Sequence, residues 1–572
     1  MGDQNAQPAD RSVLLQAMDK ALAELEGSRE RWVRLPVAQK AELLDRILKD
    51  LHPLAEEWSD ACADAKGVAR GSYAHGEEWF TFSALLKGVR MLRDTLRAVA
   101  GGSPPPLPGP MKPCGEGQIS VRVFPQSFYD RIFYPGMTTE IWTEPGVDEA
   151  AVRAGQAGLY RGPAPKGKTV LVLGAGNVSI LGPWDILDKL FCDGAVVIYK
   201  THPVTDYLTP LLERGYAALI EGGFLRIVRG AADEGAYLTS HDRVDEIHLT
   251  GSDRTYDAIV FGPGPEGRKR KQAAERLVTK PFWCELGNLS PVIVVPGPWS
   301  EGDLAYQGEH LAGMLVFNAG FNCLTTRVII QHAGWAHRQD LLREVRRVLS
   351  NTPTRRAYYP GAQAIYHAFV EAHPEAEGLG EADGSRLPWT LISGLDPARR
   401  DDICFTTEGF CSLFSETALE AEDVPSFVDA AVRFANERLW GTLTSTILVH
   451  PASLKDPAIA QAVERAVRDL RYGTVGVNVW GAINFATMAG TWGAFPGHPY
   501  NDIQSGQGTV HNLLMIPRPQ KTVIRGPFRQ WPKPPVFPSF RTLVPLARRL
   551  VHFEAAPSPF KLPGILLAAS RG

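Results

Sequence analysis

The first motif in this sequence that could bind a cofactor is Gly174-Ala175-Gly176-Asn177. It follows the apolar run 169–173. Glycines at a strand-to-helix turn allow backbone N–H groups to approach the phosphates of a dinucleotide. The pattern is incomplete, because Ser179 stands where a third glycine is expected and the next apolar run ends in Lys200 instead of an acid for the ribose. Taken alone, these residues are better explained by an ordinary strand-to-helix turn.

Three further segments carry reactive residue types in a definite order. They are Glu285-Leu286-Gly287-Asn288-Leu289-Ser290-Pro291, Phe317-Asn318-Ala319-Gly320-Phe321-Asn322-Cys323 and Glu408-Gly409-Phe410. Together with Asn177, Lys200 and Gly251-Ser252, their order and spacing resemble the aldehyde dehydrogenase superfamily. The resemblance covers residues 30–512, and although each motif alone is degenerate, the ordered set identifies the family.

The resemblance assigns a role to each motif. Cys323 would be the nucleophile, Glu285 the general base that activates water, and Asn177 the side-chain amide that holds an oxyanion together with the backbone N–H of Cys323. A nicotinamide cofactor, NAD or NADP, would be held by Lys200, Gly251, Ser252, Glu408 and Phe410. The implied reaction is the NAD(P)-dependent oxidation of an aldehyde to a carboxylic acid.

These residue types suit that chemistry. Aldehyde oxidation through a thiohemiacetal and a thioester needs a nucleophile that is reactive near neutral pH, which a thiolate is. An isolated cysteine is usually a buried and inert side chain, but the residues around Cys323 favour the nucleophile. Acyl-CoA-forming relatives generally lack the glutamate found here at position 285, so we expect a free acid as the product.

Two residues compete for the oxyanion role. Asn177 can donate from its amide, although a turn also favours asparagine for local hydrogen bonds. The alternative takes Pro183-Trp184-Asp185 as the corresponding family motif. We reject it because an ionised aspartate cannot donate, and because Asp185 lies too close in sequence to Lys200.

The sequence leaves NAD and NADP open. Relatives that prefer NAD carry a glutamate three residues after the lysine, and this chain has Pro203 there. The missing carboxylate removes repulsion toward a 2′-phosphate, which Arg229 or His202 could pair with if they point at the site. Family habit favours NAD.

Several positions depart from the family pattern. Phe321 replaces the usual glutamine, Ala175-Gly176 replaces Pro-Trp, and Cys411-Ser412 replaces Gly-Pro. Tyr256 occupies a glycine position, where it would crowd the cofactor phosphates, and Arg327 follows the cysteine by four residues instead of five. We infer a divergent subfamily.

Two other functions remain open on the same scaffold. One is an NADPH-dependent reductase of acyl thioesters, for which Glu285 would be dispensable. The other is a non-catalytic descendant that binds nucleotide or partners, which Tyr256 and Phe321 favour and which the set Cys323, Glu285, Asn177 and Lys200 opposes.

Composition bounds the remaining choices. The 572 residues carry 60 Lys and Arg against 63 Asp and Glu, which gives no general case for binding nucleic acid. The seven cysteines are scattered, which argues against a disulfide framework and against a zinc site, so no metal is expected. Residues 1–11 are polar and resemble no secretory signal, so we expect a frayed start and a cytoplasmic protein.

The segments that position the motifs indicate an α/β protein with a Rossmann-type cofactor domain, an α/β catalytic domain and a small β element for oligomerisation. Apolar spacing predicts helices over residues 12–100, extended strands over 118–147 and alternating strands and helices from 169 onward. The expected division is 1–117 (helical part of the cofactor domain), 118–165 (bridging strands), 166–284 (cofactor-binding region), 285–484 (catalytic domain), 485–512 (second part of the oligomerisation element) and 513–572 (tail).

The resemblance implies a homodimer or homotetramer. Residues 477–485, with Trp492 and Phe495, fall where relatives line the aldehyde tunnel and suggest a bulky or long-chain aldehyde, although core packing explains them equally. The tail holds eleven prolines and ten Lys or Arg but only one acid. Its stretch 540–553 is an amphipathic helix that either lies on an anionic membrane or, as we favour, packs on the body or on a sister subunit.

Overall fold

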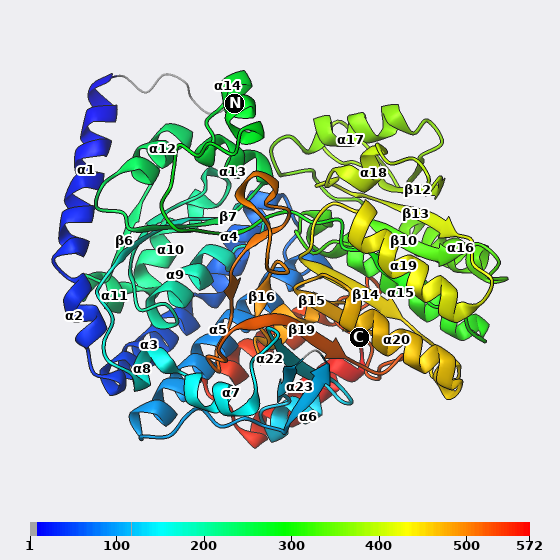
Figure 1. The fold of residues 1–572 in the computed structure, drawn as a ribbon, viewed down its shortest axis with the longest axis horizontal. Coiled ribbons are helices and arrows are strands. Elements are labelled where there is room, and N and C mark those ends of the chain that lie inside the picture. The colour runs from blue at the N-terminus through cyan, green and yellow to red at the C-terminus, as the bar shows by residue number, and fades with distance from the viewer. Residues whose placement is uncertain (1–7, 116) are drawn as a thin grey trace.

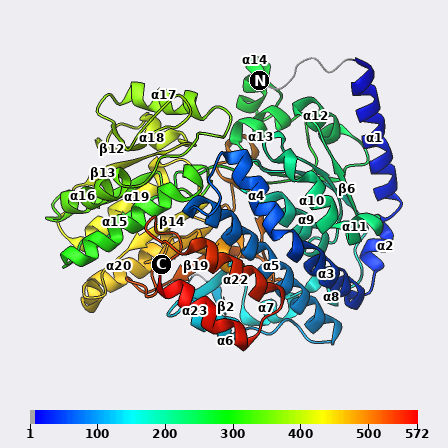
Figure 2. The ribbon, with the colours of Figure 1, turned by 180° about the vertical axis from the view of Figure 1, so that it is seen from behind.

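The computed structural model describes residues 8–115 and 117–572, so most of the stretch expected to fray lies outside the described residues. Two helix-covered β-sheets stand side by side, and the long helix α5 runs behind them next to the C-terminal helices (Figures 1 and 2). Within the described ranges, no helix combines the length and apolar character that a membrane span requires.

The first sheet has six strands in the order β17-β8-β7-β4-β5-β6. All are parallel except the edge strand β17, and β4 and β5 are buried along their whole length because helices cover both faces. The strands are β4 (Thr169–Leu173), β5 (Val196–Lys200), β6 (Leu225–Val228), β7 (Glu246–Thr250), β8 (Phe282–Glu285) and β17 (Gly506–Gln507). This sheet confirms the predicted α/β alternation.

The helices of this half of the molecule come from two parts of the chain. The N-terminal helices are α1 (Pro8–Glu26), α2 (Arg29–Arg34), α3 (Val37–Leu51), α4 (Ala55–Lys66) and α5 (Tyr73–Ala100). The later ones are α7 (Glu149–Gly155), α8 (Gly158–Arg161), α9 (Leu181–Phe191), α10 (Thr209–Gly215), α11 (Ala217–Glu221), α12 (Ala232–Ser240), α13 (Asp253–Val260) and α14 (Gly264–Gln272).

Strand register brings the predicted cofactor residues to one edge of the first sheet. Leu173 lies opposite Lys200, and Thr250 lies opposite Glu285. The turn at 174–177, Lys200 and the pair at 251–252 therefore all follow the carboxyl ends of neighbouring parallel strands. Ligands of open α/β sheets bind at this edge.

The second sheet has eleven strands in the order β1-β2-β3-β19-β15-β14-β9-β10-β13-β12-β11. Its strands are β1 (Met111–Gly115), β2 (Gln118–Phe124), β3 (Thr138–Thr143), β9 (Val292–Val294), β10 (Val328–His332), β11 (Glu377–Leu379), β12 (Trp389–Leu395), β13 (Leu413–Leu419), β14 (Thr444–Leu448), β15 (Thr474–Val477) and β19 (Pro519–Arg525). Its helices are α15 (Glu301–Val316), α16 (Arg338–Ser350), α17 (Ala362–Ala372), α18 (Ile403–Thr406), α19 (Val424–Arg438), α20 (Pro457–Asp469) and α21 (Ile483–Thr487).

Two expectations for the bridging element are corrected. Residues 118–147 are not extended throughout, because Ser127 caps a short helix, α6 (Phe128–Phe133), between β2 and β3. The strand beside β3 is β19 and does not come from 485–512. Those residues instead form β17, which pairs with β8, and β16 (Trp492–Gly493), which pairs with β18 (Thr509–Val510).

The tail is an integral part of the fold, and not the add-on that its composition suggests. β19 bridges β3 and β15 in the middle of the second sheet. The predicted amphipathic helix is α22 (Leu543–Ala555), followed by α23 (Leu562–Ser570), and α22 lies along α5 (Figure 2). Its apolar side chains Leu543, Leu546 and Phe553 are buried there. This face is therefore unavailable to a membrane.

The packing of α22 on α5 predicts a clear difference between two leucines of the tail. Leu543 is buried against Gly76, where a Cβ would come within 2.7 Å of the leucine Cγ, whereas Leu567 on α23 is 52% exposed. We expect Leu543→Ala to lower stability by about 2–5 kcal/mol, because it leaves a cavity. Leu567→Ala should change it by less than about 0.5 kcal/mol. Thermal unfolding of both variants tests this, and equal effects would contradict the packing.

Candidate active site

The predicted nucleophile and base meet between the two sheets. Glu285 ends β8, and Cys323 lies in the loop between α15 and β10. The thiol Sγ of Cys323 donates to Oε1 of Glu285 at 3.0 Å. The side chains thus stand in direct contact although 38 residues separate them.

Asn177 joins this pair in one pocket. Its Nδ2 donates to the carbonyl of Phe321 at 3.1 Å, which ties the amide to the loop that carries Cys323. Asp185, the rejected alternative, instead accepts from the hydroxyl of Thr250. Asn177 therefore lines the same pocket as the thiol, and Asp185 does not.

The rest of the pocket is almost wholly apolar. Its walls come from α5, from the turn after β4, from residues 480–492 and from the tail. The apolar lining side chains include Phe80, Ala84, Leu181, Phe317, Trp480, Ile483, Phe485, Trp492 and Val536. Among the lining residues, Glu285 alone carries an ionisable carboxyl, and it already accepts a hydrogen bond from the Cys323 thiol.

Burial sets the protonation of the pair. Loss of solvent raises the pKa of Glu285 to about 7, which the neighbouring Trp492 indole and Cys323 thiol partly oppose. Burial, followed by the negative charge of Glu285, raises the pKa of Cys323 well above its ordinary value. The thiol is therefore protonated at rest, and above pH 7 an ionised Glu285 stands ready to accept its proton.

The loop before the nucleophile has an unusual backbone. Asn318, Ala319 and Gly320 all lie in the left-handed region, with φ of 52°, 57° and 80°. A Cβ on Gly320 would stand 2.6 Å from the carbonyl of Cys411, so only glycine fits there. Arg327 secures the same loop by donating to the carbonyl oxygens of Gly320, Cys411 and Leu413.

A buried network that the sequence did not reveal holds Asn318. Lys66 donates to Glu78 at 2.6 Å and to Oδ1 of Asn318 at 2.8 Å. The backbone N–H of Asn318 donates to Glu77, which Arg355 grips with two hydrogen bonds. Burial alone would lower the pKa of Lys66, but Glu78 raises it above its ordinary value, so the lysine stays charged.

Tyr358 connects this network to the oxyanion candidate, because its hydroxyl donates to the carbonyl of Asn177 at 2.8 Å. Asn318 had appeared within the cysteine motif, but its partners come from α4, α5 and the segment before α17. No local signal marked them, since their role depends on contacts between distant segments.

The predicted cofactor residues lie at or just after the ends of strands β5 and β7 of the first sheet or, for Glu408 and Phe410, precede strand β13 of the second. Ser252 caps α13 by accepting from the backbone N–H of Thr255, which leaves Gly251 and Ser252 at a helix N-terminus. Glu408 accepts from the backbone N–H of Asn288, and a Cβ on Gly287 would lie 2.1 Å from its carboxylate. Lys200 is buried at the end of β5. These positions fit the dinucleotide cleft expected at this edge of the sheet.

Two departures have structural explanations. Tyr256 does not crowd the phosphate position: it is buried beneath α13 and donates to the carbonyl of Tyr500. Phe321, in place of glutamine, packs edge-on against Tyr358 and also contacts Phe410, with ring centroids 4.9 and 5.7 Å away. The aromatic side chain therefore reinforces the cysteine loop.

Comparisons with known proteins agree with this arrangement. The model of the aldehyde dehydrogenase family matches residues 172–364. The solved structure of an indole-3-acetaldehyde dehydrogenase complexed with NAD+ has a TM-score of 0.59 at 16% identity, covering 89% of this chain and 88% of that one. By this match and by its fold, the chain is similar to the aldehyde dehydrogenase family.

Two further known proteins are also similar to this chain. Glyceraldehyde-3-phosphate dehydrogenase GapN from Methanocaldococcus jannaschii, complexed with NADP, has a TM-score of 0.57 at 16% identity, with coverage of 90% and 94%. A 4-trimethylaminobutyraldehyde dehydrogenase A from Danio rerio is 25% identical over 289 residues, which is 50% of this chain. The match spans 51% of that relative's length.

The buried network predicts a large effect at Lys66. Lys66→Met would leave Glu78 buried without its partner, and we expect a loss of about 3–5 kcal/mol of stability. Arg70→Met removes an ion pair to Asp64 at the surface and should leave the melting temperature nearly unchanged. Thermal unfolding of the two variants distinguishes these outcomes, and equal melting temperatures would show that the buried pair is dispensable.

The contact between Glu285 and Cys323 predicts a shift in thiol titration. Removing the carboxylate charge with Glu285→Gln should move the pH midpoint of Cys323 alkylation by iodoacetamide to lower pH. Peptide mass spectrometry can follow each cysteine, and the distant, partly exposed Cys114 in the same samples should keep its midpoint. An unchanged or higher midpoint at Cys323 would mean that Glu285 does not control the thiol.

Proposed function

We propose that this protein oxidises an apolar aldehyde to its carboxylic acid with NAD(P), through a covalent adduct on Cys323. The hydrogen bond from the Cys323 thiol to Glu285, within a pocket that also holds Asn177, carries the proposal. A thiol and a carboxyl that share one proton can first supply a nucleophile and later activate water.

The steps follow from the positions of these groups. Glu285 accepts the thiol proton as Sγ attacks the aldehyde carbon, and the oxyanion that forms is stabilised by the Asn177 amide and the Cys323 backbone N–H. When bound, the nicotinamide supplies the oxidation by accepting hydride. Glu285 releases the thiol proton to solvent, takes a proton from the water that hydrolyses the thioester, and returns a proton to the sulfur of Cys323 as the acid leaves. Since the pKa of Glu285 is about 7, the rate should rise as pH increases through that value.

The cleft would hold the cofactor by its predicted residues, Lys200, Gly251, Ser252, Glu408 and Phe410. His202 and Arg229 are the two candidate partners for a 2′-phosphate. Burial and the neighbouring Lys200 lower the pKa of His202 to about 4, so this histidine is neutral at pH 7. Arg229 lies 3.3 Å from Asp206 and is already paired. These contacts favour NAD over NADP.

The pocket wall favours an apolar substrate. Relatives with modest identity are named for 4-trimethylaminobutyraldehyde, a cationic substrate. Apart from Glu285, this pocket offers no carboxylate to a cation, and aromatic and aliphatic side chains dominate its lining. A bulky or long-chain aldehyde without charge would bury most of its surface there.

Assembly and location are further parts of this proposal. β1 forms an outer edge of the second sheet, and its unpaired main-chain groups suit pairing within a homodimer or homotetramer. We also propose a cytoplasmic site of action. With the apolar face of α22 buried, the proposal requires no membrane contact.

Absorbance of the reduced cofactor tests the activity. Purified protein with NAD or NADP should convert uncharged aliphatic and aromatic aldehydes but not trimethylammonium aldehydes, with NAD the better cofactor. Cys323→Ala should abolish the signal. Glu285→Gln should slow the single-turnover burst, because the acceptor of the thiol proton is gone, and lose steady-state acid release by at least about 100-fold, because water is no longer activated.

Two results would redirect the proposal. Reduction of acyl thioesters by NADPH that survives Glu285→Gln would favour the reductase. Folded protein that turns over no aldehyde and no thioester, and whose biological role survives Cys323→Ala, would favour the non-catalytic descendant.

A further inference from the structure

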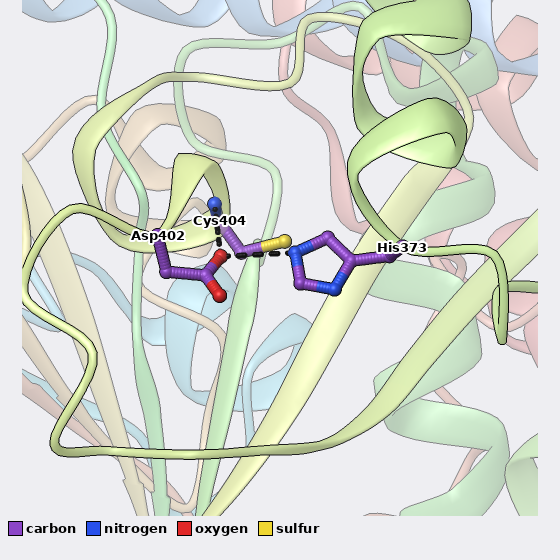
Figure 3. Close-up of side chains that lie close together, drawn as sticks. All are labelled: His373, Asp402 and Cys404. Atoms are coloured by element: carbon purple, nitrogen blue, oxygen red, sulfur yellow. Dashed lines mark hydrogen bonds and ion pairs between the residues drawn. The ribbon is translucent and has the colours of Figure 1, made fainter.

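A second cluster of reactive side chains lies in the lobe built on the eleven-stranded sheet, apart from the proposed active site. His373 directly follows α17, Asp402 caps α18, and Cys404 lies in the first turn of α18. Figure 3 shows the imidazole, the carboxylate and the sulfur converging. One potential ligand atom from each lies within 4.8 Å of the others, and each residue is at most 3% exposed.

Both ring nitrogens of His373 face a carboxylate oxygen. Nδ1 lies 3.0 Å from Oε1 of Glu375, and Nε2 lies 3.0 Å from Oδ1 of Asp402. A neutral imidazole carries one N–H, so it can donate to only one of these carboxylates. If Nδ1–H donates to Glu375, the lone pair of Nε2 faces Asp402, which is the orientation of a histidine ligand supported by an outer carboxylate.

Asp402 supplies an independent indication. Its Oδ1 accepts from the backbone N–H of Cys404 and faces His373. Its Oδ2 is buried and has no hydrogen-bond partner among the described residues. A buried carboxylate oxygen without a partner carries a desolvation cost that a cation would offset.

We propose that His373, Asp402 and Cys404 bind a Zn²⁺ ion. Nitrogen, oxygen and thiolate sulfur are the three ligand types that zinc accepts, and tetrahedral bond lengths place such atoms roughly 3.3–3.7 Å apart. The thiolate of Cys404 and the carboxylate of Asp402 together balance the charge of the ion. Binding releases the thiol proton of Cys404 and any proton on Nε2 to solvent, and water completes the fourth position.

Such an ion would link α17 to α18. The chain then reaches Glu408 four residues after Cys404, so the ion would brace the segment that leads to the cofactor cleft. The cysteine spacing gave no sign of this site, because a single cysteine contributes and the histidine comes from 31 positions earlier.

Zinc content and thermal stability test the proposal without any measurement of activity. Full-length protein is incubated with ZnSO₄, passed over a chelating resin and analysed by plasma mass spectrometry. We expect a single zinc ion per chain and a higher melting temperature than that of EDTA-treated protein, because the ion binds only the folded state. Substitution with Co²⁺ should give a thiolate-to-metal charge-transfer band.

Variants locate the ion. His373→Gln and Cys404→Ser should each lose the retained zinc and the zinc-dependent rise in melting temperature, and Cys404→Ser should also lose the cobalt band. The matched control is Cys62→Ser, another fully buried cysteine outside the cluster, which should retain zinc. Wild-type protein that retains no zinc and melts at the same temperature with and without it would overturn the proposal, as would retention by both cluster variants.

Discussion

The active site depends on one constraint, the left-handed backbone that precedes Cys323. Three consecutive residues in this region, two of them with side chains, are costly unless the surroundings hold them. Asn318 meets that requirement through the carbonyl of Asn177 and the buried pair Lys66–Glu78. The same contacts that secure the loop therefore also set the distance between the nucleophile and the oxyanion amide.

The electrostatics of the site follow from the exclusion of water by burial. Glu285 and Cys323 lie between two sheets in an apolar pocket, where ionising either group is unfavourable and ionising both is worse. One proton shared over 3.0 Å is the natural outcome. Burial raises the pKa of the carboxyl to about 7 and keeps the thiol protonated near neutral pH.

The composition of the tail, residues 513–572, did not predict its place in the fold, because that place depends on pairing with distant segments. Prolines and basic residues indicated an appendage, yet β19 completes the large sheet and Val536 lines the pocket. Short strands that pair only with distant segments carry little local signal, because their stability comes from neighbours and not from their own periodicity.

The sequence by itself determined the family, the alternating strands and helices from residue 169 onward, and the motifs around Asn177, Glu285 and Cys323. These are local patterns of hydrophobic spacing and of short ordered segments, which survive in a linear chain. Only the tertiary structure decided that Tyr256 turns away from the cofactor cleft, that Lys66, Glu77 and Arg355 support the nucleophile loop, and that His373 meets Cys404. Each of these depends on contacts between residues far apart in the chain, and burial gives them their energy.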